Sequence, residues 1–222
     1  MSGRDEHARR RPVQARSTAT VQAVLDAARA VLNAGGELTA RSIAERAGIA
    51  APTVYRYFAD VKAVVDALVG EHAAAAEAMV AEVLAADDGA DVGVAFSRVL
   101  DGYLRLYQAR PEFTVMWSST ELAERQRAVE EQSDHALAGR LAAHLVAGGA
   151  VPRAQRDRFA RRVALHWRMA GVALGAALRA SRPAERREAD RDLHDFVAYA
   201  ADQCLRSAPG HPRRTAAPRP TG

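Results

Sequence analysis

Apolar positions recur at helical spacing along most of this 222-residue chain. In the first such stretch, from Val21 to Leu32, they fall at i, i+3, i+4, i+7, i+10 and i+11, which is one face of a helix. Gly35 and Gly36 end this helix, because glycine tolerates the left-handed conformation found there. A second, short helix is expected after Thr39, which suits an N-cap, and ends at Gly48.

The remaining chain reads as further helices separated by glycine, proline and aspartate. They are expected at about 51–57, from an Asp60 cap to 84, and at about 92–108, 119–146, 152–180 and 184–206. A short segment rich in large side chains follows Pro111. The pattern shows no credible strand and no internal repeat, so it predicts an all-α protein.

Composition excludes several classes of protein. The single cysteine, Cys204, rules out a disulfide framework and a multi-thiolate metal site. Gly-rich phosphate loops, HExxH, paired CxxC and GxSxG are absent, and so is the Glu-x-x-His pair of carboxylate-bridged bundles. We therefore expect no enzyme activity, no metal and no cofactor. The longest uncharged apolar run, Met169 to Leu178, is too short for a bilayer, and no signal peptide is recognisable, so a cytoplasmic protein is expected.

Charge is distributed unevenly along the chain. Residues 1–62 hold ten basic and six acidic residues, whereas residues 63–208 hold 18 arginines and 21 acids. A basic front on an acidic body indicates that the front meets a polyanion, although chance scatter of charges would also give such a difference.

Two short helices around Gly48, after a longer helix, are the elements of a helix-turn-helix. Apolar residues can form its small core: Ile43, Ala44, Ala47, Ile49, Val54 and Phe58. The second helix then presents hydroxyls, a guanidinium and an aromatic face outward, on Ala51, Thr53, Tyr55, Arg56 and Tyr57. Such groups suit phosphate and base-edge contacts in the major groove, although an ordinary helical hairpin would share the pattern.

At these residues the chain resembles the DNA-binding domain of TetR-family transcriptional regulators. The matching stretches are Val24 to Ala28, Ile43 to Gly48, Thr53 to Phe58 and Ala63 to Leu68. The chain departs from the family pattern at Ala50, where a serine cap is frequent, and at Val61, where a lysine is usual. Lys62, one position later, is the candidate for that phosphate contact.

The DNA-binding residues expected from the motif and the resemblance lie on both short helices and at the start of the next. Thr39, Arg41 and Ser42 would hold phosphate at the start of the second helix. Ala51, Pro52, Thr53, Tyr55, Arg56 and Tyr57 would enter the groove, with Arg56 as the candidate for a guanine contact. The arginines of residues 1–16 would follow the minor groove or the backbone, or form only a solubilising arm.

The resemblance also implies a homodimer joined by the last two long helices and a small-molecule site among the middle ones. The dimer interface is expected at Phe159, Val163, Trp167, Gly171, Leu174, Leu178 and Phe196. The ligand wall is expected at Tyr103, Tyr107, Phe113, Met116 and Trp117, whose concentration in sequence suits an apolar pocket. Packing inside the subunit is the alternative role for each of these residues.

The predicted organisation is a basic disordered arm (1–16), a three-helix helix-turn-helix domain (17–62), a helical-bundle ligand-binding and dimerisation domain (63–208) and a disordered tail (209–222). The predicted function is sequence-specific regulation of transcription, as a repressor that a small, largely apolar molecule releases from a double-stranded DNA operator. The alternatives are a helical-bundle enzyme or metal carrier, an architectural DNA-binding protein and an activator.

Overall fold

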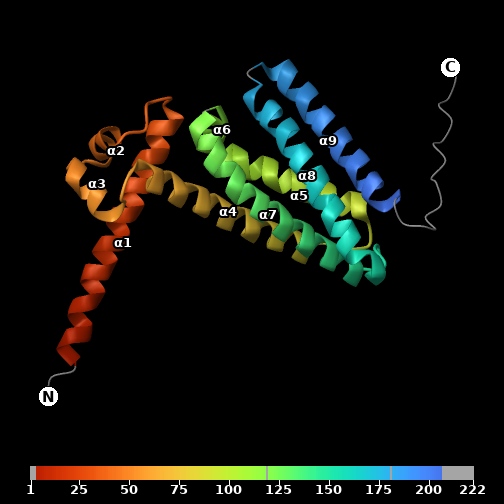
Figure 1. Ribbon diagram of the computed structural model, residues 1–222, viewed down its shortest axis with the longest axis horizontal. Coiled ribbons are helices and arrows are strands. Elements are labelled where there is room, and N and C mark those ends of the chain that lie inside the picture. Colours follow the sequence, from red (N-terminus) through yellow and green to blue (C-terminus); the bar gives the residue numbers. More distant parts are fainter. Residues whose placement is uncertain (1–3, 119, 181, 207–222) are drawn as a thin grey trace. The chain divides into compact units, whose positions relative to one another are not determined.

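A computed structural model describes residues 4–118, 120–180 and 182–206 (Figure 1). The regular secondary structure of these residues is helical, and none of them forms a strand. The all-α fold expected from the sequence is confirmed. The helices begin and end within a few residues of the predicted positions, with the exception of the first. No helix in the described part is long and apolar enough to cross a membrane.

Contacts divide the chain into two compact units. Unit 1 comprises Met1–Ala75 and Tyr107–Val129. It holds α1 (Arg4–Asn33), α2 (Ala40–Ala47), α3 (Ala51–Tyr57), the first part of α4 (Val61–Ala85) and α6 (Glu112–Ser118). The core of its N-terminal part is built from apolar residues of each of the first four helices, among them Val24, Ala28, Ile43, Val54, Val64 and Leu68.

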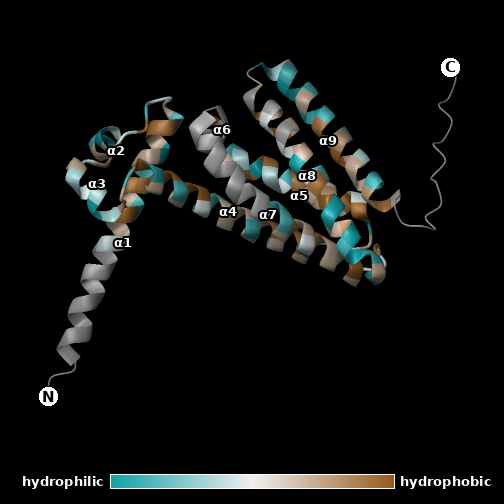
Figure 2. Ribbon diagram, in the orientation of Figure 1, coloured by the Kyte–Doolittle hydropathy of each residue, from teal (hydrophilic) through white to brown (hydrophobic). Residues whose placement is uncertain are grey.

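Unit 2 comprises Ala76–Leu106 and Glu130–Gly222. Its helices are the rest of α4, most of α5 (Val92–Ala109) and of α7 (Thr120–Ala147), then α8 (Arg156–Arg179) and α9 (Pro183–Arg206). A short 3₁₀ turn, Arg153–Gln155, precedes α8. Phe96 anchors the core, with ring centroids 6.4 Å from Phe159 and 6.5 Å from Trp167. Figure 2 shows hydrophilic residues interspersed with these hydrophobic ones along the helices of unit 2.

Two predicted boundaries differ from the structure. The arm predicted to be disordered over residues 1–16 is instead helical from Arg4 onward, as the first part of α1. Arginine, alanine and glutamine favour helix, and lengthening an existing helix needs no new nucleus, so an apolar stripe is not required. The side chains of residues 4–16 and the predicted tail, 209–222, lie outside the described residues. The predicted division after residue 62 also differs, because α6 packs on α1.

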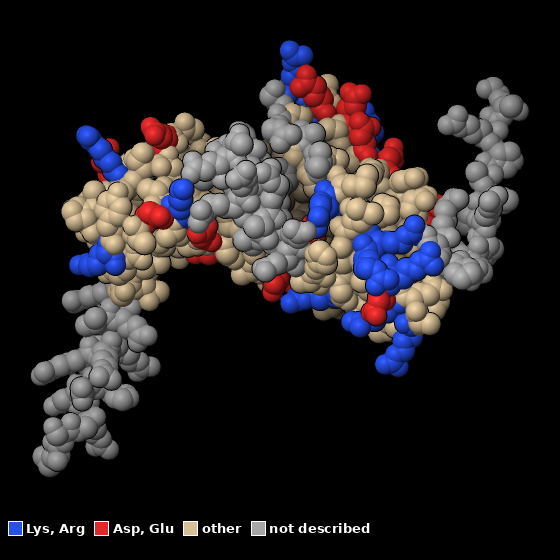
Figure 3. All heavy atoms as spheres, viewed as in Figure 1, with Lys and Arg blue, Asp and Glu red and all other residues tan. Residues whose placement is uncertain are grey.

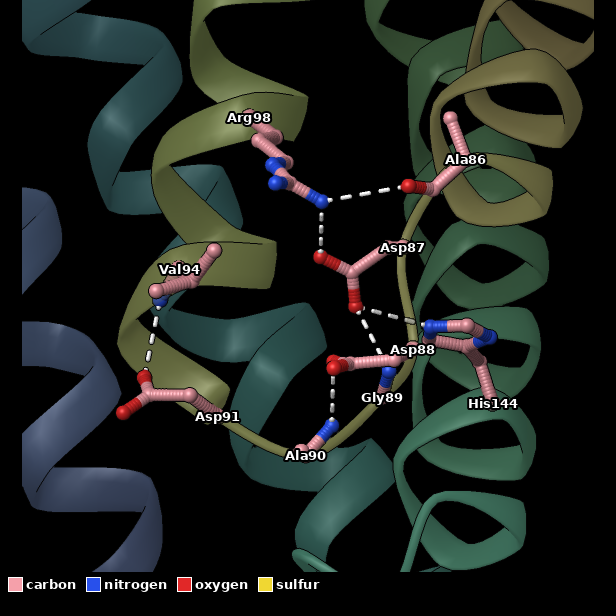
Figure 4. A network of polar contacts seen from close by, with 9 residues as sticks. All are labelled: Ala86, Asp87, Asp88, Gly89, Ala90, Asp91, Val94, Arg98 and His144. Atoms are coloured by element: carbon pink, nitrogen blue, oxygen red, sulfur yellow. Dashed lines mark hydrogen bonds and ion pairs between the residues drawn. The ribbon is translucent and has the colours of Figure 1, made fainter.

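A buried carboxylate holds the α4–α5 loop to α7 (Figure 4). The side chain of Asp87 is 2% exposed and accepts hydrogen bonds from the Gly89 backbone N–H at 2.8 Å and from Arg98 Nη1 at 2.7 Å. His144 Nε2 lies 3.0 Å from the same carboxylate. Gly89 adopts a φ of +68°, and a Cβ there would lie 2.8 Å from the His144 carbonyl oxygen, so only glycine fits this turn.

Candidate nucleic-acid interface

The start of α2 is closed by a reciprocal cap. Thr39 Oγ1 accepts from the Ser42 backbone N–H at 3.0 Å, and Ser42 Oγ accepts from the Thr39 backbone N–H at the same distance. The serine hydroxyl also lies 2.8 Å from the Glu37 carbonyl oxygen, to which it can donate. These two hydroxyls are therefore used within the cap, and the capping prediction for Thr39 is confirmed.

The turn between α2 and α3 depends on Gly48. Its φ of +66° lies in the left-handed region, and its backbone N–H bonds back to the end of α2. α3 then begins without a side-chain cap, because Ala50 offers no oxygen, and Pro52 occupies the first turn. Proline costs little at this position, since the first N–H groups of a helix have no intrahelical partner. The turn fixes the direction in which α3 leaves α2.

α3 buries one side and exposes the other. Val54 is 1% exposed and Phe58 is 9% exposed, so both belong to the small core. Pro52, Tyr55 and Arg56 are exposed, and the tyrosine keeps 56% of its surface in water. An exposed aromatic ring beside a guanidinium suits contact with bases and phosphates.

Tyr57 lies between the exposed face and α1. Its pKa is below the ordinary value, chiefly because the Thr20 hydroxyl of α1 hydrogen-bonds the phenol oxygen, with Arg56 and Ser17 adding to the effect against partial desolvation. Arg56 Nη2 donates to the phenol oxygen at 3.2 Å, and its guanidinium carbon lies 4.9 Å from the ring centroid. Tyr57 thus also holds the end of α3 to α1.

Basic side chains flank this surface. Arg41 is exposed and donates to Glu45 at 2.8 Å, an i, i+4 surface pair that a phosphate can readily replace. Lys62 is exposed in the first turn of α4. That helix begins with the predicted cap, since Asp60 Oδ1 accepts from the Ala63 backbone N–H at 2.7 Å. The structure therefore brings the expected groove and phosphate residues onto the helix-turn-helix and its flanks.

Comparison with known families identifies this arrangement. Residues 24–68 match the family described as bacterial regulatory proteins of the tetR family, and residues 90–196 match the tetracyclin repressor-like C-terminal domain. The chain belongs to the TetR family of transcriptional regulators. It is a DNA-binding regulator with an N-terminal helix-turn-helix and a helical C-terminal domain. No curated protein matches the chain.

The predicted ligand wall of this TetR-family chain is divided between the two units. Tyr107, Phe113 and Met116 are buried in unit 1, where the first two pack against the ring of His72 with centroids 4.9 and 3.9 Å away. Tyr103 belongs to unit 2 and packs on Trp167 at 5.3 Å. It lines a hollow of about 10 Å³, far below the roughly 300–1,000 Å³ of typical ligand sites. The side chain of Trp117 lies outside the described residues.

The structure buries most of the predicted dimer residues within the subunit. Phe159, Val163, Trp167 and Leu174 are each at most 8% exposed in the single subunit, so they form its core and offer little surface to a partner. Gly171, Leu178 and Phe196 are half-buried. The large apolar residues that α8 and α9 do expose are Leu165, Met169 and Tyr199, at 59%, 53% and 58%. Leu165 and Met169 are i, i+4 on the opposite face of α8, and spacing alone does not tell which of the two apolar faces enters the core.

Sequence reasoning also missed an ionic junction within unit 1. The side chain of Glu112 is 3% exposed, and its oxygens lie 3.6 Å from Arg29 Nε and 3.4 Å from Asn33 Nδ2. Arg29 is bonded as well to Glu71 of α4. The junction lines an open cleft of about 770 Å³ between α1, α4 and the start of α6. Glu71 and Glu112 lie 42 and 83 positions from Arg29 in the sequence, so no local pattern predicts these contacts.

Proposed function

We propose that this protein represses transcription by binding, as a homodimer, a two-fold symmetric DNA operator that a small, largely apolar molecule makes it release. The observation that carries the proposal is the exposed face of α3, with Tyr55 and Arg56 pointing away from the core behind the Gly48 turn. Two such helices related by a two-fold axis would reach successive major grooves, ~34 Å apart.

The roles of individual residues follow from their surroundings. Pro52, Thr53, Tyr55 and Arg56 read the groove, and Arg56 has the fork geometry that pairs with guanine. Arg41 and Lys62 hold phosphates on either side. Thr39 and Ser42 act through the backbone that their cap orders, because their hydroxyls already bond to one another. Tyr57 contributes a phosphate contact only in addition to its bond to α1.

Selection of binding sites from random DNA tests this function. A regulator with the proposed geometry enriches one palindromic sequence whose half-sites are separated by about one helical turn. An architectural DNA-binding protein would enrich no sequence, and a helical-bundle enzyme would retain no DNA at all. Competition with unrelated duplex at matched salt separates these outcomes, because non-specific binding depends on salt and not on sequence.

Arg56→Ala is expected to weaken binding to the selected operator by about 10- to 100-fold, which corresponds to ~1–3 kcal/mol for one bidentate base contact. Because Arg56 is exposed, its removal should leave the thermal midpoint nearly unchanged. Titration of labelled operator measures the affinity. Arg140→Ala, which removes an exposed arginine of unit 2, is the control for loss of one positive charge. Equal affinities of wild type and Arg56→Ala would remove this residue from the interface.

Trp117→Ala is expected to abolish the response to an inducer while operator affinity stays at the wild-type value. The reason is the sequence concentration of large side chains around Pro111, which favours a largely apolar ligand. Lowering operator affinity tenfold requires the inducer to prefer the released geometry by only ~1.4 kcal/mol. Indole fluorescence follows binding, with Trp167 as the comparison. An inducer that still releases DNA from Trp117→Ala would place the pocket elsewhere.

A further inference from the structure

Tyr57, the last residue of α3, is held by side chains of α1. The Thr20 hydroxyl hydrogen-bonds its phenol oxygen, and Ser17, which lies about one turn earlier on α1, also hydrogen-bonds it. The ring of Tyr57 is half-buried, whereas Tyr55 on the same short helix is exposed. The polar end of Tyr57 is therefore fixed by a different helix from the one that carries it.

The side chain of Arg56 folds onto this fixed ring. Its Nη2 donates to the phenol oxygen at 3.2 Å, and its guanidinium carbon lies 4.9 Å from the ring centroid. Consecutive residues of a helix point about 100° apart and do not face one another, so Arg56 must bend around α3 to make both contacts. Because α1 already holds the ring, the arginine follows the ring and not the reverse.

The contact leaves the charge of Arg56 available. Its partner is a phenol and not a carboxylate, so the positive charge is not cancelled, and the remaining N–H groups of the guanidinium can still donate. Arg56 is exposed. Figure 3 shows an uncharged surface around α3, at the left, with basic groups projecting above and below it. The arginine is thus oriented without being neutralised.

We propose that Thr20 is a positioning residue for DNA reading: it fixes the ring of Tyr57, and the ring holds the Arg56 guanidinium in the orientation that meets one base pair. We call these three residues the α1–α3 relay. The inference rests on the base contact proposed above for Arg56 and adds what determines the selectivity of that contact.

Pre-orientation of the guanidinium favours selectivity for a physical reason. A free arginine samples many rotamers, and ordering it on DNA costs conformational entropy. A guanidinium that is already oriented loses less entropy, and its planar fork then matches only the base edge that lies in front of it. An arginine released from Tyr57 would reach several base edges or phosphates with similar ease.

Thr20→Val tests the relay, because valine keeps the branched shape of threonine and lacks the hydroxyl. Discrimination among base pairs at the position that Arg56 reads should fall about 3- to 10-fold, the loss expected for one hydrogen bond. Discrimination at the other positions of the operator should not change. Titration of labelled operators that differ at single base pairs, at matched salt, measures both. The position is the one at which Arg56→Ala loses discrimination.

Three further variants separate positioning from a merely structural role. In a chain that already carries Arg56→Ala, Thr20→Val should cause no further loss of discrimination, because the hydroxyl acts through the guanidinium. Thr20→Ser keeps the hydroxyl and should discriminate like wild type. Thr18→Val removes an exposed hydroxyl two positions away on α1 and should also discriminate like wild type.

The protein without DNA offers an independent measurement. The hydrogen bond from Thr20 is the main cause that lowers the pKa of Tyr57. Thr20→Val should therefore raise the pKa of Tyr57, and Thr18→Val should leave it unchanged. NMR titration of protein with isotope-labelled tyrosine measures this pKa, and Tyr57→Phe assigns the signal. The thermal midpoint checks that each variant is folded.

The outcomes distinguish this inference from the function on which it rests. A wild-type protein that selects no operator, or an Arg56→Ala variant that discriminates like wild type, would overturn the base contact and the relay with it. Loss of discrimination in Arg56→Ala but not in Thr20→Val would overturn the relay alone. A Thr20→Val variant that binds all operators equally more weakly, and with a lower thermal midpoint, would reduce Thr20 to a structural contact and also overturn the relay.

Discussion

Leu165→Arg combined with Met169→Arg is expected to produce a folded monomer that no longer holds a full operator. Both side chains are more than half exposed in the subunit, so their replacement removes no core packing. In the homodimer proposed above, Leu165 and Met169 are large apolar side chains of α8 that remain available to a partner, and a guanidinium buried in their place without a partner charge is costly. Each substitution is present in both subunits of a two-fold dimer, so four side chains change, and at ~1 kcal/mol each the dissociation constant of the dimer rises by about 1,000-fold.

Sedimentation at micromolar concentration measures whether the variant is a monomer. Titration of labelled operator then measures how much affinity for DNA the monomer has lost. A monomer presents one recognition helix and contacts one half-site, so its affinity should fall to that of a half-operator. Val94→Arg combined with Ala143→Arg is the control, since both residues are exposed in unit 2 outside α8 and α9. A double variant of α8 that sediments as a dimer would show that this face is not the interface.

Local features of this chain were predictable from the sequence because local physics decides them. Apolar spacing and caps place the helices, and Thr39 and Asp60 cap the helices they were expected to cap. Gly48 has the positive φ that a tight turn requires. The helix-turn-helix was therefore visible in the sequence, together with the residues of α3 that face away from its core.

Long-range features were not predictable in the same way. α8 is apolar on two faces, and periodicity does not tell which one enters the core; the expected interface residues Val163 and Trp167 turned inward, whereas Leu165 stayed outside. The junction between Arg29 and Glu112 and the pair of Asp87 with His144 join residues 83 and 57 positions apart. Only the packing of the helices decides such partners.

Asp87→Ala is expected to lower the free energy of unfolding by about 3 kcal/mol, the low end of the range for breaking a buried ion pair, because Arg98 keeps half of its surface in water. For a chain of this length that corresponds to a fall in thermal midpoint of about 6–12 °C. Asp88→Ala is the matched control. The carboxylate of Asp88, next to Asp87 in the sequence, is exposed and accepts one hydrogen bond, from the Ala90 backbone N–H at 3.0 Å.

The dependence of the unfolding free energy on pH in the acid range should identify the same carboxylate. Burial opposes ionisation of Asp87, but hydrogen bonds from His144 and the Gly89 backbone N–H, with the charge of Arg98, outweigh it and hold its pKa below the ordinary 3.8. Because the folded-state pKa is depressed, its contribution is complete above the unfolded-state value and is lost as pH falls through the folded-state pKa. The difference in unfolding free energy between wild type and Asp87→Asn should therefore be constant near neutral pH and shrink below pH ~4. Urea unfolding at a series of pH values measures it. A difference that stays constant to the acid end of the series would show that folding does not lower the pKa of Asp87.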